Sequence, residues 1–302
     1  LRKNYMTPPT GRRFQLPFFF RGKRLFSASL RLAVHEAALV DVLGGQAREL
    51  TTQALPVGLD GQLLSGVVDQ GWRTCTVLDD RIAYVLSRDV WHYLAWTGCY
   101  DRFLEGRFTA KSRESFARDE ARFIETFGVA EGRGLDLRVY RSPAEMAEFL
   151  RHAALVGGSA DGASLARAAA QGTAHGFVLF AKGVPAAYLC LEANGEALQY
   201  ACAGERPDYR QWSAGSIVHL QAFQRLFADV RYRFVDFRPG DNEVKRQFAN
   251  GSLRAATVLQ LKRTLFHRLL LGAHALLQRR DEDNTATEAV SEEIQTLLGE
   301  RA

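Results

Sequence analysis

The hydrophobic positions between residues 135 and 262 alternate between strand spacing and helix spacing. Leu135, Leu137 and Val139 recur at every second position, as in a half-buried strand. Ser142-Pro143-Ala144-Glu145 combines an N-cap, a proline at the first helical position and a capping-box glutamate, which predicts a helix start. The pattern then predicts a second helix (163–171) and three strands (175–181, 184–192, 197–203). These are followed by a helix from 213, a strand (231–240), a short basic helix and a last strand (253–261). The predicted order is β-α-α-β-β-β-α-β-α-β, with an antiparallel meander in the middle.

The first 130 residues show a weaker pattern. Residues 12–43 predict two or three strands, and the stretch around Pro56, Gly58 and Gly61 is rich in turn residues. A helix is predicted over residues 89–100. We interpret this region as a smaller α/β lobe.

A basic helix is predicted over residues 107–128, with Phe116, Phe123 and Phe127 at its apolar positions. We expect it to end the first lobe and to bridge the two lobes. Beyond Gln278 the chain is charged and predicts at most a short helix near residues 292–298. The predicted domains are therefore an N-terminal α/β lobe over 1–130, a C-terminal domain over 131–278 and a charged peripheral tail over 279–302.

Length and composition are those of a water-soluble, two-lobed globular protein. The chain has 302 residues, of which 47% are apolar and 24% charged. Its longest apolar run, FHRLLLGAHALL, is too short to span a bilayer and contains an arginine and two histidines. The basic N-terminal stretch lacks the cleavage site of a secretory signal. We expect a cytoplasmic protein without a membrane span.

Charge and ligand-type residues exclude several further classes of function. The net charge of +5 suits phosphorylated cofactors or anionic substrates, but the basic residues are scattered, so no nucleic-acid partner is expected. Cys75, Cys99, Cys190 and Cys202 form no CxxC pair and are too few for a disulfide framework. The seven histidines form no ligand motif. We predict reduced thiols and no metal.

The segment from Leu198 to Gly251 has the element order of a cofactor site. After the strand 197–203 and a loop, Ser213-Ala214-Gly215-Ser216 opens a helix, with Ser213 as a natural N-cap. Small residues leave the first-turn N–H groups accessible at the positive end of the helix dipole. A pyrophosphate is therefore expected to bind at this helix start.

An acidic residue ends the next strand. By strand alternation Asp236 shares a face with Tyr232 and Phe234, so its carboxylate is expected on a largely apolar side, where it needs a cationic or hydrogen-bonding partner. Lys245 follows within reach. The two residues are predicted either to serve catalysis or to form a strand-end ion pair that holds the following helix.

These elements and motifs resemble the GNAT acyltransferase fold. Within it, the chain is similar to CelD-like acetyltransferases, which are related to FemAB-like peptidyltransferases. The segments that carry this resemblance are Ala110-Lys111-Ser112-Arg113, Ser213-Ala214-Gly215 and Asp236-Phe237-Arg238-Pro239-Gly240-Asp241 with Lys245. The family's SPG has alanine at its second position here, and Val244 replaces a frequent histidine.

The resemblance implies a two-lobed α/β protein with a degraded N-terminal GNAT-like lobe and a complete C-terminal GNAT lobe. It also implies acetyl-CoA or another acyl-CoA as co-substrate, with the pyrophosphate on Ser213, Ala214, Gly215 and Ser216. The expected reaction is direct acyl transfer to an amine of a sugar, amino acid or cell-envelope precursor. O-acylation is also open.

Direct transfer requires a proton acceptor, stabilisation of an oxyanion and protonation of the leaving thiolate. Asp236 is the candidate base or amine-orienting group, and Lys245 is the candidate to neutralise the oxyanion or anchor Asp236. Tyr209 is a candidate proton donor or simply a loop tyrosine, and Lys111 and Arg113 either contact substrate or form a solvated face. Two other functions stay open: a catalytically silent binding or assembly protein of polysaccharide biosynthesis, and FemAB-like aminoacyl transfer.

Overall fold

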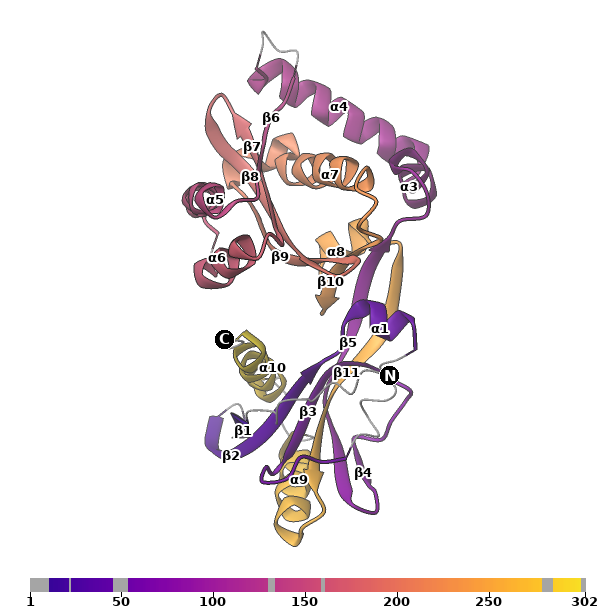
Figure 1. Cartoon of the computed structure of the whole chain (residues 1–302), viewed down its shortest axis with the longest axis vertical. Coiled ribbons are helices and arrows are strands. Elements are labelled where there is room, and N and C mark those ends of the chain that lie inside the picture. The colour runs from indigo at the N-terminus through magenta and orange to yellow at the C-terminus, as the bar shows by residue number, and fades with distance from the viewer. Residues whose placement is uncertain are drawn as a thin grey trace. The chain divides into compact units, whose positions relative to one another are not determined.

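Two strands, β5 (Arg81–Ala95) and β11 (Gly251–Lys262), divide their residues between the two units of the chain (Figure 1). The computed structural model describes residues 11–21, 23–45, 54–129, 134–158, 161–278 and 285–299. Of these, the first unit holds the residues up to Trp91, Pro239–Asp241 and those from Leu253 onward. The second unit holds His92–Arg238 and Asn242–Ser252.

The first unit is a sheet covered by helices from the end of the chain. Its strand order is β1-β2-β3-β11-β5, with β4 paired to β5, and β2 and β3 are parallel. The elements are β1 (Arg12–Phe20), β2 (Lys23–Glu36), α1 (Leu39–Leu43), β3 (Gly61–Val68), β4 (Cys75–Val77), α9 (Leu265–Gln278) and α10 (Thr285–Gly299). Residues 12–36 thus form two strands, in agreement with the two or three predicted. That this unit is a degraded copy of the second stays a prediction.

The C-terminal segment packs into the first unit and is not peripheral. Val290, Ile294 and Leu297 are at most 4% exposed and follow the spacing of one helix face. They join Phe14 and Leu16 of β1 in one apolar cluster. The prediction of a peripheral tail is therefore wrong for α10, which is a core helix. The segment is highly charged, and its apolar residues were not recognised as one helix face.

Residues 89–95 form a strand, where a helix over 89–100 was predicted. They complete β5, and the next helix, α3, begins only at Tyr100 (Tyr100–Arg107). Asn250 holds the end of this strand, because its side chain bonds both the N–H and the carbonyl of Ala95 at 2.8 and 2.9 Å. Pairing with residues distant in sequence thus overrides a local pattern that suits either element.

From β6 to β11 the chain follows the predicted order β-α-α-β-β-β-α-β-α-β, but the last strand belongs to the first unit from Leu253 onward, so the second unit ends before the predicted boundary at residue 278. Its strands are arranged β10-β9-β8-β7-β6, antiparallel except for the parallel pair β9–β10. The elements are α4 (Ala110–Phe127), β6 (Asp136–Tyr140), α5 (Pro143–Val156), α6 (Gly162–Ala170), β7 (Ala174–Ala181), β8 (Val184–Asn194), β9 (Ala197–Glu205), η1 (Pro207–Trp212), α7 (Ala214–Phe227), β10 (Phe234–Pro239) and α8 (Glu243–Phe248).

Local sequence signals explain several of these boundaries. Ser142 and Glu145 form the predicted capping box at the start of α5, and Gly157 ends that helix in the left-handed conformation. Lys182 and Gly183 both have positive φ, as the tight turn between β7 and β8 requires. The meander is therefore encoded largely by short-range chemistry.

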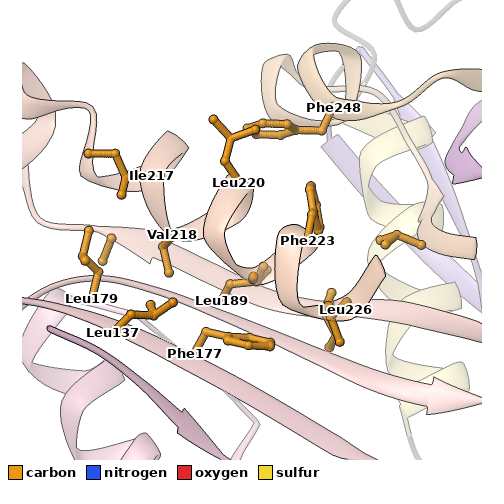
Figure 2. Close-up of a cluster of buried hydrophobic side chains, with 14 of the residues drawn as sticks. Leu137, Phe177, Leu179, Leu189, Ile217, Val218, Leu220, Phe223, Leu226 and Phe248 are labelled. Carbon is orange, nitrogen blue, oxygen red and sulfur yellow. The ribbon is translucent and has the colours of Figure 1, made fainter. Parts of the chain in front are cut away.

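Alternate strand residues face two different apolar clusters. Helix α7 covers one face of the sheet, and α5 and α6 cover the other (Figure 1). Figure 2 shows the α7 side, where Val218 and Leu226 lie against the strands and Leu220 lies beside Phe248 of α8. Burying each such side chain contributes about 1.5–3 kcal/mol.

The basic helix α4 lies within the second unit, so the unit begins well before the predicted boundary at residue 130. Phe123 is fully buried, and Phe116 and Phe127 pack against the same cluster as α7. The helix was expected to end the first lobe and to bridge the two lobes. Its three phenylalanines instead fix it to the second unit.

Candidate active site

Strands β9 and β10 part at the candidate site. Their parallel pairing comprises three positions and ends with Asp236 opposite Gln199. Strand β9 continues to Glu205, and no further pair with β10 forms among the described residues. The edge of residues 200–205 that faces β10 therefore presents backbone groups that a ligand can pair with.

A β-bulge bends β9 at the same place. Cys190 pairs with Cys202 and Leu191 with Tyr200, so Ala201 is an extra residue in β9. A bulge of this kind increases the local twist of a strand. The separation of β9 from β10 thus has a local cause in the pairing with β8.

The start of α7 holds the four residues predicted to bind pyrophosphate. Ser213 occupies the N-cap position in the left-handed conformation, with φ 55°. Its hydroxyl makes no cap bond and instead donates to Asp119 Oδ2 of α4 at 2.8 Å, so the expected capping role is corrected. Ala214 is fully buried, and Ser216 Oγ accepts a long 3.5 Å bond from Gln247.

A carboxylate from the end of β9 is bound at this helix start. The amide N–H of Gly215 donates to Glu205 Oε1 at 2.7 Å, and Arg210 lies 3.7 Å from the other carboxylate oxygen. A carboxylate oxygen is the same kind of ligand as a phosphate oxygen for a helix N-terminus. The first turn of α7 is therefore arranged to hold an oxyanion, and Glu205 supplies one.

Asp236 belongs to a polar row that crosses three strands. Gln199 is in register with Glu192 of β8 on one side and with Asp236 of β10 on the other, so the three side chains share a face. Val235 and Phe237 belong to the α7 cluster, which places Asp236 on the opposite face. The predicted apolar surroundings of Asp236 are therefore wrong, because cross-strand neighbours make this face polar.

Hydrogen bonds connect the polar row to Arg238, near the end of β10. Asp236 is 1% exposed and accepts a 2.7 Å bond from the amide of Arg238. The Arg238 guanidinium reaches Gln199 Oε1 at 3.5 Å, and Arg238 itself has φ 60°. A residue other than glycine in this conformation is strained, and such strain is concentrated at functional sites.

Glu192 lies at the far end of the row. Burial raises the pKa of its carboxyl, and the charges of Arg238 and of Arg167 in α6 oppose that rise. The row therefore combines carboxylates, an amide and guanidinium groups on the α6 side of the sheet. Such a set can recognise and deprotonate an amine.

Lys245 lies at the end of β10 that carries Asp236 and Arg238. Its Nζ donates to the carbonyl of Arg238 at 3.1 Å, and its amide bonds to Asn242, which caps α8. The predicted neighbours Asp236 and Lys245 are thus joined through Arg238. Whether they act in catalysis or only secure α8 stays a prediction.

The remaining predicted residues lie elsewhere in the second unit. Tyr209 in η1 packs edge-on against Phe127 of α4, with ring centroids 5.5 Å apart. Lys111 and Arg113 lie in the first turn of α4, and within the described residues no side-chain hydrogen bond or ion pair joins them to the polar row. Their proposed contacts with substrate have no support in this geometry.

A buried tyrosine–histidine pair was missed from the sequence. Because the carbonyl of Gly215 can only accept, His219 Nδ1 donates to it at 2.7 Å, and Nε2 accepts from the Tyr200 hydroxyl at 2.9 Å. Burial lowers the pKa of His219 to about 4, against a weaker opposing effect of the Gly215 bond. Phe248 stacks on the ring at 4.9 Å, so the neutral histidine joins β9, α7 and α8.

The sequence carried only part of the signal for these residues. His219 follows Gly215 by one helical turn, which indicates a shared face of α7. Glu205, Gln199 and Glu192 have no motif: Gln199 and Glu192 meet only through strand register, and Glu205 reaches the Gly215 amide at the end of β9. Among the described residues there is no group of three or more potential metal ligands, and no helix is long and apolar enough to cross a membrane.

Residues 110–246 match a family model described as acetyltransferase (GNAT) domain. This match and the order of elements from β6 to α8 identify the GNAT fold in the second unit. GNAT domains use acetyl-CoA as co-substrate, and acyl transfer is the general chemistry of the family. No curated protein matches the sequence.

Solved structures resemble the chain at low identity. FemX is 11% identical, with 86% of this chain and 90% of that chain covered and a TM-score of 0.49. The C-terminal domain of a putative lysylphosphatidylglycerol synthetase from Agrobacterium fabrum is 10% identical, with 89% of each chain covered and a TM-score of 0.46. A GCN5-related N-acetyltransferase from Kribbella flavida is 15% identical, with coverage of 67% and 66% and a TM-score of 0.35. Similarities at this level add nothing to the family match.

Proposed function

We propose that this protein is an acyl-CoA-dependent N-acyltransferase that transfers an acetyl group to an amine of a sugar, amino acid or cell-envelope precursor. The parting of β9 and β10 beside the start of α7, within the segment that matches the GNAT domain, carries this proposal. The finer assignment to a CelD-like branch is part of the proposal. It rests on Ala110-Lys111-Ser112-Arg113, Ser213-Ala214-Gly215 and the Asp236 segment.

The donor would lie along the open edge of β9. Its pyrophosphate would replace Glu205 at the Gly215 amide, with the amides of Ala214 and Ser216 beside it. Its pantetheine arm would pair with the backbone of residues 200–205. This placement puts the thioester near the point where the strands part.

The acceptor would approach from the face that carries the polar row. Asp236 takes a proton from the acceptor ammonium, and the freed nitrogen attacks the thioester carbonyl carbon. Lys245, held by the Arg238 carbonyl at the same strand end, stabilises the negative oxygen that develops. The C–S bond then breaks, and the attacking nitrogen loses its second proton, which Tyr209 of η1 would relay to the leaving thiolate.

One observation favours a second candidate. Glu205 already fills an oxyanion position at the start of α7, and its negative charge opposes a pyrophosphate. A protein in which Glu205 stays there would have a closed donor site, as in a silent binding or assembly subunit. The two candidates differ in whether acyl-CoA binds.

Calorimetric titration with acetyl-CoA and CoA, and with ADP as a nucleotide control, tests the proposal directly. Saturable binding of both acetyl-CoA and CoA is expected. Glu205→Gln should tighten binding several-fold, because it removes the competing charge and retains a similar shape. Glu196→Gln, at an exposed hairpin position of the same unit, is the matched control and should leave the affinity unchanged.

Absence of acyl-CoA binding to both the natural protein and the Glu205→Gln variant would overturn the proposal and favour the silent subunit. Gly215→Tyr provides a second check on the site. An added side chain at Gly215 would meet the Glu205 carboxylate at 3.3 Å and obstruct the amide. Unchanged affinity in this variant, if folded, would place the pyrophosphate elsewhere.

A further inference from the structure

Two cysteines face each other across β8 and β9. Cys190 and Cys202 are direct partners in the antiparallel register, and theirs is the last pair before the bulge at Ala201. Both side chains lie on the α5 side of the sheet, in the cluster that contains Phe149 and Tyr188. The other two cysteines, Cys75 and Cys99, are exposed.

The geometry of a direct antiparallel pair suits a disulfide. Such partners have Cα atoms about 4.5–5.5 Å apart, which falls within the range of about 4.4–6.8 Å found in disulfides. The two strands therefore need no large movement to bring the sulfur atoms together.

The two thiols differ in reactivity. The interaction between the two thiols lowers the pKa of Cys202, and the same interaction, with burial, raises the pKa of Cys190. Cys190 is fully buried, whereas Cys202 is half-buried. Cys202 is therefore the thiol that an oxidant meets first, and Cys190 is placed to react second.

We propose that Cys190 and Cys202 form a site of reversible oxidation that reacts with a peroxide and closes to a cross-strand disulfide. The Cys202 thiolate attacks one peroxide oxygen, the O–O bond breaks, and Cys202 becomes a sulfenic acid with release of water. Cys190 sulfur then attacks the Cys202 sulfur, the S–O bond breaks, and a second water leaves. Two thiols and one hydrogen peroxide thus give one disulfide and two waters.

The disulfide would tie the open edge of β9 to β8. Cys202 lies within residues 200–205, the part of β9 that continues beyond its last pair with β10. The cross-link restrains this segment next to its bulge. The inference stands independently of acyl transfer, because it concerns only the thiols and the strand that holds them.

The experiment uses the full chain with Cys75 and Cys99 replaced by serine, so that only the facing pair can oxidise. The protein is treated with a slight excess of hydrogen peroxide, alkylated and digested without reductant. No Lys or Arg separates the two cysteines, so the tryptic peptide that contains both should lose two hydrogens and escape alkylation. Cleavage after Glu192 and Glu196 should then give two peptides joined through Cys190 and Cys202, and dithiothreitol should release them.

Hydrogen exchange supplies the structural measurement. Amides of residues 200–204 should exchange several-fold more slowly in the oxidised protein than in the reduced protein, with little change in β6. Cys202→Ser is the matched control and should show no effect of peroxide on exchange. Alkylation of both cysteines after peroxide, or oxidation of Cys202 to a sulfinic acid without a disulfide in the folded protein, would overturn the proposal.

Discussion

Both units place polar side chains in register across their sheets, yet the two sets differ in their surroundings. In the first unit Gln62 and Gln260 are strand partners, joined by a 2.8 Å bond, and Arg81 donates to the same Gln260 oxygen at 3.0 Å. Arg81 also forms a two-point ion pair with Asp80. All but Asp80 are at most 6% exposed.

The difference lies in whether strand pairing continues past the polar groups. Strands β3 and β11 stay paired on both sides of Gln62 and Gln260, so these groups satisfy one another within a closed sheet. The row Glu192, Gln199 and Asp236 sits where the pairing of β9 with β10 stops. A buried polar set serves stability where pairing continues, and is a candidate for chemistry where the strands separate.

The largest expected effect is that of Asp236→Asn on turnover. The amide keeps an oxygen that can accept the bond from Arg238, so the fold should persist. Loss of a general base lowers kcat by about 10²- to 10⁴-fold. Steady-state kinetics with the best amine acceptor and calorimetry with acetyl-CoA would check this.

Acetyl-CoA affinity should stay unchanged in Asp236→Asn. Asp229→Asn, which changes an ion-pair residue between α7 and β10, is the control and should turn over normally. If Asp236→Asn keeps full activity, the polar row of the second unit is as structural as that of the first. The proposed difference between the polar sets of the two units would then be wrong.

Arg81→Met should act on stability alone. Methionine can fill the space, but Gln260 loses a buried donor, which costs about 1–3 kcal/mol in the free energy of unfolding. Urea denaturation followed by circular dichroism would measure this loss in the free energy of unfolding. Arg88→Met, at a more exposed ion pair with Asp69, should cost at most about 1 kcal/mol. Reduced acetyl-CoA affinity in folded Arg81→Met would contradict a purely structural role.

Lowering the pH should weaken both units through their buried histidines. Burial lowers the pKa of His175, His219 and His274 to about 4. Between about pH 6.5 and 4 the unfolded chain binds protons that the folded protein does not. The free energy of unfolding should therefore decrease as the pH is lowered through this window, by at most about 1.4 kcal/mol per pH unit for each histidine.

Two single substitutions sharpen this prediction, because His219 lies in the second unit and His274 in the first. Urea denaturation of His219→Gln and His274→Gln between pH 4.5 and 6.5 should give a shallower pH dependence than the natural protein. Above pH 7 the slopes should coincide. Equal slopes throughout would mean that these histidines are protonated in the folded state.

The fold of the second unit could be predicted because its signals are short-range. The capping box at Ser142, the left-handed Gly157 and the Lys182-Gly183 turn each act within a few residues. Residues 89–95 were mistaken for helix because their strand partners lie more than a hundred residues away. Helix α10 was predicted too short and as peripheral, because the segment around its apolar stripe is highly charged.

Of the candidate site, the sequence pointed to the strand that bears Asp236, to the start of α7 and to Lys245, since each lies in a recognisable segment. It could not show Glu205 at the Gly215 amide, the Tyr200–His219 pair or the row from Glu192 to Asp236. Those contacts depend on register and on the bulge at Ala201, where a shift of one residue turns every side chain to the other face. The sequence by itself determined which elements form from β6 to β11 and in what order, because caps, turns and periodicity act locally. Only the tertiary structure decided which side chains meet, because that follows from how distant strands align.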